Sequence, residues 1–227
     1  MSDYSFGIND LTKMSDKKEK ERAGQILNRL KKVYPDVKSA IESESPFQLL
    51  IATILSAQCT DERVNIVTKD LFKKYKKPKD YLMVSNSGLE KDIFSTGFFR
   101  QKAKSIKLTC KKLLDDYDGE VPANFDELTK LPGVGRKTAS VVAGNAYDIP
   151  AIAVDTHVKR LSNLLGFISS NNVDKIEDRL KVLFTKKDWV NSSHWLATHG
   201  RKICIARRPK CDECFLCDLC PGFQSVI

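Results

Sequence analysis

The chain has 227 residues, with 38 Lys and Arg against 29 Asp and Glu, a formal net charge of +9 and an isoelectric point near 9.1. Hydrophobic residues make up 41% of the chain, which indicates a globular protein and excludes a disordered one. The basic balance favours a polyanionic partner, although a solvated lysine-rich surface would give the same composition. No segment approaches the roughly 20 apolar residues that span a bilayer, and the N-terminus has no apolar signal core. We therefore expect a cytoplasmic protein, nucleoid-associated in a prokaryote, without membrane contact.

The spacing of apolar residues predicts an all-α fold. After a flexible polar leader of about 16 residues, we expect a charged amphipathic helix at 17–33. Ser45-Pro46 is typical of a helix start, with Gln48 completing a capping box, and Thr60 is a second candidate cap. Further helices are predicted at about 78–84, 87–94, 98–117, 124–130, 136–146, 155–165, 172–184 and 188–203. No run has convincing strand-type alternation.

A glycine-rich turn at Leu131–Lys137 (LPGVGRK) separates two of these helices. Its two glycines permit positive φ and close approach of a ligand to the backbone. Free N–H groups at the start of the next helix form an anion site suited to a DNA phosphate. The candidate contacts are Gly133, Val134, Gly135 and Arg136. An ordinary helix connection with a glycine cap is the alternative.

Lys137 follows this turn and is a candidate amine nucleophile. The helix N-terminus and the neighbouring Arg136 both disfavour its charged form, and a Schiff-base lysine needs the neutral amine. Binding a phosphate, or simple exposure to solvent, is the alternative role for this lysine.

Asp155 lies 18 residues further on, after the apolar run Ala151–Val154. It can cap the following helix, and it can also take a proton or stabilise positive charge developing at a sugar. The neighbouring His157 is expected to be a structural hydrogen-bonding residue.

Five of the seven cysteines lie between Cys204 and Cys220. Cys204, Cys211, Cys214 and Cys220 have the spacing C-x6-C-x2-C-x5-C, and four thiolates so close in sequence can surround either Zn²⁺ or a [4Fe–4S] cluster. Cys217 lies within the loop but outside this pattern, so the spacing alone does not give a unique set of ligands. The other two cysteines are expected to be small buried hydrophobic residues.

Several motifs together resemble endonuclease III of the helix-hairpin-helix glycosylase superfamily. They are LPGVGRK at Leu131–Lys137, VDTH at Val154–His157, LSAQCTD at Leu55–Asp61, STGFFRQK at Ser95–Lys102, HGRKICIAR at His199–Arg207, and the spacing of the four cysteines. The resemblance covers the chain from about Ser39 to Cys220. Cys59 is a departure, because many members have alanine there.

The resemblance implies two helical lobes with a DNA cleft between them. One lobe, residues 39–149, would be a six-helix barrel that includes the helix-hairpin-helix motif. The other would combine residues 17–38 with 150–227 and hold a [4Fe–4S] cluster. The implied activity is excision of oxidised pyrimidines from duplex DNA, followed by β-elimination 3′ to the abasic site. The expected partner is duplex DNA that contains damaged bases or abasic sites, bound by a monomer.

The resemblance also assigns roles to individual residues. It implies that Lys137 is the Schiff-base nucleophile, that Asp155 is the essential acid, and that Cys204, Cys211, Cys214 and Cys220 are the cluster ligands. Gln58 matches a residue that enters the space left by a flipped base, and Phe98 matches an apolar wedge against the opposite strand. The alternatives are that Gln58 only caps a helix end and that Phe98 belongs to the core.

Two rival functions remain open from the sequence. One is a monofunctional mismatch glycosylase of the same fold, although such enzymes characteristically lack a lysine at the position of Lys137. The other is a non-catalytic helix-hairpin-helix module that only grips phosphate.

Overall fold

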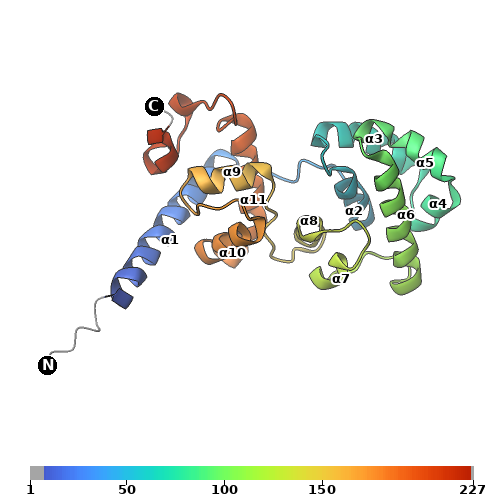
Figure 1. Ribbon diagram of the computed structural model, residues 1–227, viewed down its shortest axis with the longest axis horizontal. Helices are drawn as coiled ribbons and strands as arrows, with labels where there is room; N and C mark the ends of the chain where they lie inside the picture. The colour runs from blue at the N-terminus through green and yellow to red at the C-terminus, as the bar shows by residue number, and fades with distance from the viewer. Residues whose placement is uncertain (1–7, 226–227) are drawn as a thin grey trace. The chain divides into compact units, whose positions relative to one another are not determined.

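The computed structural model describes the backbone of residues 8–225 and the side chains of residues 16–223. The described residues form α-helices, short 3-10 helices and loops, with no strand. The α-helices are α1 (Ile8–Val33), α2 (Pro46–Leu55), α3 (Asp61–Lys74), α4 (Pro78–Met83), α5 (Asn86–Asp92), α6 (Phe99–Asp116), α7 (Phe125–Thr129), α8 (Arg136–Tyr147), α9 (Thr156–Leu164), α10 (Val173–Leu183) and α11 (Trp189–Lys202) (Figure 1). None of the described helices is long and apolar enough to cross a membrane. The predicted all-α fold is confirmed.

The first helix is longer than the sequence predicts. It begins at Ile8 rather than Lys17, so the expected flexible leader is wrong for residues 8–16. Residues 1–7 lie outside the described part of the chain. Residues 8–16 contain no Pro or Gly, the two residue types that interrupt helices most strongly, so an established helix extends into them at little cost.

Local capping explains where several helices begin. Ser45 accepts a hydrogen bond from the Gln48 N–H at 3.1 Å, and Thr60 accepts one from the Arg63 N–H, as predicted. The Gln48 side chain accepts from the Glu44 N–H, one residue before the cap, so the capping box differs from its usual form by one position. Each such cap satisfies a backbone donor at the helix start, which contributes about 1 kcal/mol.

The chain divides into two compact units. We call Ser39–Ala151 the hairpin unit, and we call the residues up to Lys38 together with those from Ile152 onward the cysteine unit. Each has its own cluster of buried hydrophobic side chains. Each unit is described by itself below.

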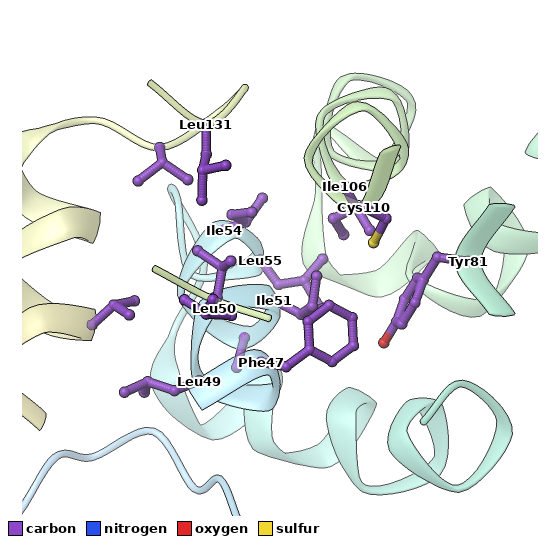
Figure 2. Close-up of a cluster of buried hydrophobic side chains, with 14 of the residues drawn as sticks. Phe47, Leu49, Leu50, Ile51, Ile54, Leu55, Tyr81, Ile106, Cys110 and Leu131 are labelled. Atoms are coloured by element: carbon purple, nitrogen blue, oxygen red, sulfur yellow. The ribbon is translucent and has the colours of Figure 1, made fainter. Parts of the chain in front are cut away.

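In the hairpin unit, α2 lies at the centre of the core. Eight of its ten residues are buried, because it packs against α3, α6 and α8. Figure 2 shows Phe47 and Leu55 of this helix near Ile106 of α6, with the Tyr81 ring beside them. The Phe47 and Tyr81 rings meet edge to face, with centroids 5.6 Å apart. The helix is therefore a fixed base for the turn that follows it.

In the cysteine unit, α1 holds the C-terminal loop through two arginines. Arg22 donates to the carbonyl oxygens of Leu165 at 2.7 Å and Leu219 at 2.9 Å. Arg29 donates to the carbonyl oxygen of Phe215 at 2.8 Å and forms a bidentate pair with Asp218. The N-terminal helix therefore anchors the loop that carries the cysteines, although nearly 200 residues separate them in sequence.

Candidate functional sites

The glycine-rich turn connects α7 to α8 and is held in place by α6. The Thr109 hydroxyl on α6 donates to the Pro132 carbonyl oxygen. Gly133 has φ of +77°, and a Cβ atom there would lie 2.7 Å from the Ser105 Cβ. Only glycine fits this position, because both the left-handed backbone and the contact with α6 exclude a side chain.

Gly135 does not have the positive φ that was expected for both glycines of the turn. Its φ is −87°, so it does not use positive φ. It occupies the N-cap position of α8, and no atom lies within 4 Å of the place a Cβ would take. Since glycine has no capping side chain, the first N–H groups of α8 have no partner within the helix. These N–H groups can donate hydrogen bonds to a bound anion.

The remaining hairpin residues take different positions. Lys137 is exposed in the first turn of α8. Arg136 is also exposed, and its guanidinium lies over the Phe125 ring at 5.5 Å. Val134 is only 5% exposed and packs in the core, while its N–H donates to the Leu131 carbonyl oxygen. The Val134 side chain therefore anchors the hairpin in the core, and its place among the phosphate contacts stays a prediction.

Gln58 and Phe98 come together at one cavity of about 240 Å³ in the hairpin unit. Gly133 also lines this cavity, so three residues that are distant in sequence share one surface. Both side chains stand on left-handed backbone, with φ of 53° at Gln58 and 48° at Phe98. Phe98 is 64% exposed, which excludes the alternative of a core residue.

Asp155 is the N-cap of α9 in the cysteine unit. One oxygen accepts the Val158 N–H at 2.7 Å, and the other lies 4.0 Å from the Arg201 guanidinium. The carboxylate side chain is 18% exposed. The cap occupies one oxygen, so the second oxygen is the one that can act on a bound molecule.

Two groups beside Asp155 were not singled out for this site from the sequence. His194 and Arg201 both lie on α11, seven residues apart, which places them on one face of the helix. Burial, with a further contribution from Arg201, lowers the pKa of His194, while Asp155 opposes the shift. In the sequence, their seven-residue spacing indicates only that the two side chains share a helix face. Nothing in the sequence indicates that this face meets Asp155.

The five cysteines of the C-terminal loop line a single cavity of about 50 Å³. It is closed by apolar side chains that include Leu161, Leu164 and Leu216. Short hydrogen-bonded turns place a cysteine at every third residue from 211 to 220, so Cys217 lines the cavity together with the four cysteines of the pattern. The structure therefore brings all four predicted ligands to one place. Cys110, by contrast, is buried in the other core, as expected, and Cys59 is half-buried.

Polar side chains hold the cysteine backbone and thiols. Arg160 donates to the carbonyl oxygens of Gly200 and Cys204, at 2.9 and 2.6 Å. The His199 ring lies between Tyr34 and Cys214, with Nδ1 3.2 Å from the tyrosine hydroxyl and Nε2 3.5 Å from the sulfur. Burial lowers the pKa of His199 to about 4. In the tautomer protonated at Nε2, the neutral ring accepts from the hydroxyl and donates to sulfur.

The donor set fits a cluster better than a single ion. Burial raises the pKa of the Cys204 and Cys214 thiols, so thiolates at this site require the compensating positive charge of a metal centre, iron or zinc. No three cysteine, histidine or acidic side chains among the described residues converge closely enough to hold one metal ion. Zn²⁺ needs sulfur ligands at about 2.3 Å, whereas a four-iron cluster is larger and takes its cysteines farther apart. The zinc alternative is therefore not supported.

Comparisons with known proteins show which family the chain is similar to. Residues 51–186 match the HhH-GPD superfamily of base excision DNA repair proteins, and residues 204–220 match the iron-sulfur binding domain of endonuclease III. Endonuclease III of Synechocystis is 49% identical over 95% of this chain and 98% of its own length. The Bacillus subtilis protein of the same name is 48% identical over 88% of this chain and 91% of its own, and the Escherichia coli protein is 41% identical over 89% and 96%.

Solved structures give the same result. A non-covalent endonuclease III–DNA complex is 46% identical and superposes with a TM-score of 0.89 over 91% of this chain and 97% of that chain. A trapped endonuclease III–DNA covalent intermediate is also 46% identical, with a TM-score of 0.88 over 91% and 98%. At these identities and coverages, the chain belongs to the endonuclease III family of the helix-hairpin-helix superfamily.

Proposed function

We propose that this protein is a bifunctional DNA glycosylase and abasic-site lyase. It removes oxidised pyrimidines from duplex DNA and then cleaves the strand 3′ to the abasic site. The main support is an exposed lysine at the start of the hairpin helix in a chain that is 46% identical to an endonuclease III trapped covalently on DNA. Because its substrate is DNA, we expect the protein to act in the cytoplasm of a bacterial cell.

The hairpin binds the DNA backbone. Gly133 keeps the turn close to α6, and Gly135 leaves the N–H groups at the start of α8 available to a phosphate oxygen. Arg136 adds positive charge at the same end of the helix. These contacts carry no base information, and they fix the register of the duplex on the protein.

Gln58 and Phe98 occupy the space that a flipped nucleotide leaves. A base inside the duplex is inaccessible to an attacking amine, so the target must leave the stack. The exposed amide of Gln58 can bond to the orphaned partner base, and the apolar Phe98 ring can stack against the opposite strand. That both side chains line one cavity supports their action at one base step.

Lys137 supplies the nucleophile. Its neutral Nζ forms a bond to C1′ of the extruded nucleotide while the glycosidic bond breaks, and the base leaves with that electron pair and a proton. Opening of the sugar ring gives an iminium ion that acidifies the proton at C2′. Removal of this proton expels the 3′ oxygen with its phosphate, and hydrolysis of the imine frees the lysine.

Asp155 stabilises charge and moves the proton. Its N-cap bond to Val158 fixes the carboxylate, and the other oxygen faces the developing positive charge of the sugar. The same oxygen can act as a proton acceptor in the reaction. The Arg201 guanidinium lies 4.0 Å from that oxygen and orients it.

Cys204, Cys211, Cys214 and Cys220 would hold the [4Fe–4S] cluster, which would fix the fold of this loop. The loop they fix carries Arg207, Arg208 and Lys210, which adds positive charge for contact with the DNA backbone.

The proposal is tested with a duplex that carries one oxidised pyrimidine. The wild-type protein should release the base, cut the strand and form a covalent adduct in the presence of borohydride. K137A should still bind the duplex but give no adduct. Base release and binding without an adduct in the wild-type protein would identify a monofunctional glycosylase, and binding without base release would identify a non-catalytic module.

A further inference from the structure

The hairpin unit contains a buried lysine to which the reaction above gives no role. Lys102, in α6, is only 5% exposed. Its ammonium group donates to the carbonyl oxygens of Leu55 and Thr96, both at 2.8 Å. Burial lowers the pKa of Lys102, which reflects the cost of holding an ammonium group away from water. An apolar side chain would avoid that cost, so the two hydrogen bonds are the informative feature of this position.

The two carbonyl groups belong to two separate turns. Leu55 is the last residue of α2 and leads directly into the turn that carries Gln58. Thr96 ends a short 3-10 helix (Phe94–Thr96) and leads through Gly97 to Phe98. Lys102 therefore connects the bases of the turns that present the two exposed side chains.

Both turns are strained where they present those side chains. Gln58 and Phe98 are non-glycine residues with positive φ. A residue stays in this region of backbone space only where its surroundings impose the conformation. The backbone N–H at position 102 donates to the Phe98 carbonyl oxygen at 3.0 Å in the first turn of α6, so the second turn is joined to the helix that carries Lys102.

One face of α6 joins these turns to the hairpin. Lys102, Ser105 and Thr109 follow Phe98 at spacings of four, three and four residues, which places them on one side of the helix. Lys102 and Ser105 line the cavity with Gln58 and Gly133. Thr109 holds the hairpin through the Pro132 carbonyl oxygen.

We propose that Lys102 is a positioning residue, which holds the Gln58 and Phe98 turns in register so that both side chains enter the same base step of the DNA. It acts through these two residues and does not touch the reacting atoms. The inference rests on the proposed function, since it assumes that Gln58 and Phe98 enter the duplex. It predicts a selective defect. Extruding a paired base requires both side chains, whereas a preformed abasic site has no base to extrude.

The experiment compares two rates on otherwise identical duplexes, release of an oxidised pyrimidine and strand cleavage at a preformed abasic site. K102M removes both hydrogen bonds and keeps most of the side-chain volume. K104M removes a charge from the same helix at an exposed position and is the matched control. L113A creates a cavity in the core of α6 and shows the effect of destabilisation alone. Q58A is the reference for loss of gap filling.

K102M should lower base release roughly tenfold more than abasic-site cleavage, because two buried carbonyl groups lose their donor and both turns relax. Q58A should show the same selectivity, and adding K102M to Q58A should change the ratio little further. K104M should keep the wild-type ratio. L113A should reduce both rates together.

The proposal would be overturned if K102M lost both rates equally, as L113A does at a similar melting temperature. It would also be overturned if the ratio of base release to abasic-site cleavage in K102M equalled that of the wild-type protein. If K102M does not fold, K102R retains charge and donors and should show a milder form of the same selectivity. An equal loss of both rates in K102R would also overturn it. Failure of the wild-type protein to release any base would instead refute the proposed function and, with it, this inference.

Discussion

The hairpin unit and the cysteine unit hold their functional residues in different ways. In the hairpin unit, Gln58, Phe98 and Gly133 lie in turns with left-handed backbone, and contacts with α6 hold these turns in place. In the cysteine unit the important groups are sheltered, and polar side chains such as Arg160 and His199 bond to them directly. Backbone geometry therefore determines the first site, and charge compensation determines the second. Substitutions should affect the two units differently.

The largest effect in the cysteine unit is expected at Asp155. D155N should lower base release by about 10²–10⁴-fold, because the amide can neither take a proton nor stabilise positive charge. Asparagine caps helices as well as aspartate, so α9 should remain intact. Single-turnover kinetics and a thermal melt measure the two quantities. Unchanged turnover, or a melt that accounts for the loss of activity, would rule out the catalytic role.

Loss of a cluster ligand should destabilise the cysteine unit alone. C211S is expected to remove the visible absorbance of the cluster and to lower the melting temperature by roughly 10 °C, because ligand binding contributes to folding. Hydrogen exchange should rise in α1, α9 and α11 and stay unchanged in the hairpin unit.

C217S is the matched control, because Cys217 lines the same cavity outside the spacing pattern. It should keep the iron content and spectrum of the wild-type protein. A cluster that survives C211S but is lost in C217S would contradict the ligand assignment.

The hairpin unit should respond to backbone changes. G133A should cost about 2–4 kcal/mol, since a methyl group would meet Ser105 on a left-handed backbone. G135A should cost no more than about 1 kcal/mol, because that φ is ordinary and the space beside it is open. Chemical denaturation of the two variants gives the comparison. Equal costs would show that the turn is not held by α6.

The smallest effect concerns pH. Burial and Arg201 lower the pKa of His194 in the folded protein, so the unfolded chain binds a proton first as the pH falls. The stability from the neutral ring is present above the ordinary histidine pKa, near 6.5, and is lost as the pH falls below it. The melting temperature of H194Q should therefore fall less than that of the wild-type protein when the pH is lowered from 7.5 to 5.5. An identical loss in both proteins would show that His194 does not contribute.

Local signals in the sequence were sufficient for the helices and for several site residues. Ser45 and Thr60 are residue types with a strong preference for the N-cap position. The cysteines are so close in sequence that short turns bring them to one cavity. The predicted start of α1 was misplaced, because residues 8–16 are polar but contain no Pro or Gly that would end a helix.

Tertiary relations could not be obtained in this way. Lys102 is one lysine among many, and only the folded chain shows that it joins two turns. Gln58 and Phe98 give no local indication of left-handed backbone. The burial of Val134 depends on the core beneath the hairpin. Such features depend on contacts between segments that are distant in sequence, which residue patterns alone do not encode.

The identity of the lysine that bonds to DNA tests the account most directly. Wild-type protein is reacted with a lesion duplex in borohydride, the adduct is digested, and mass spectrometry locates the modified side chain. We predict a single modified residue, Lys137, in the peptide that begins α8. A deoxyribose remnant on any other amine, or no modified peptide despite base release, would contradict it.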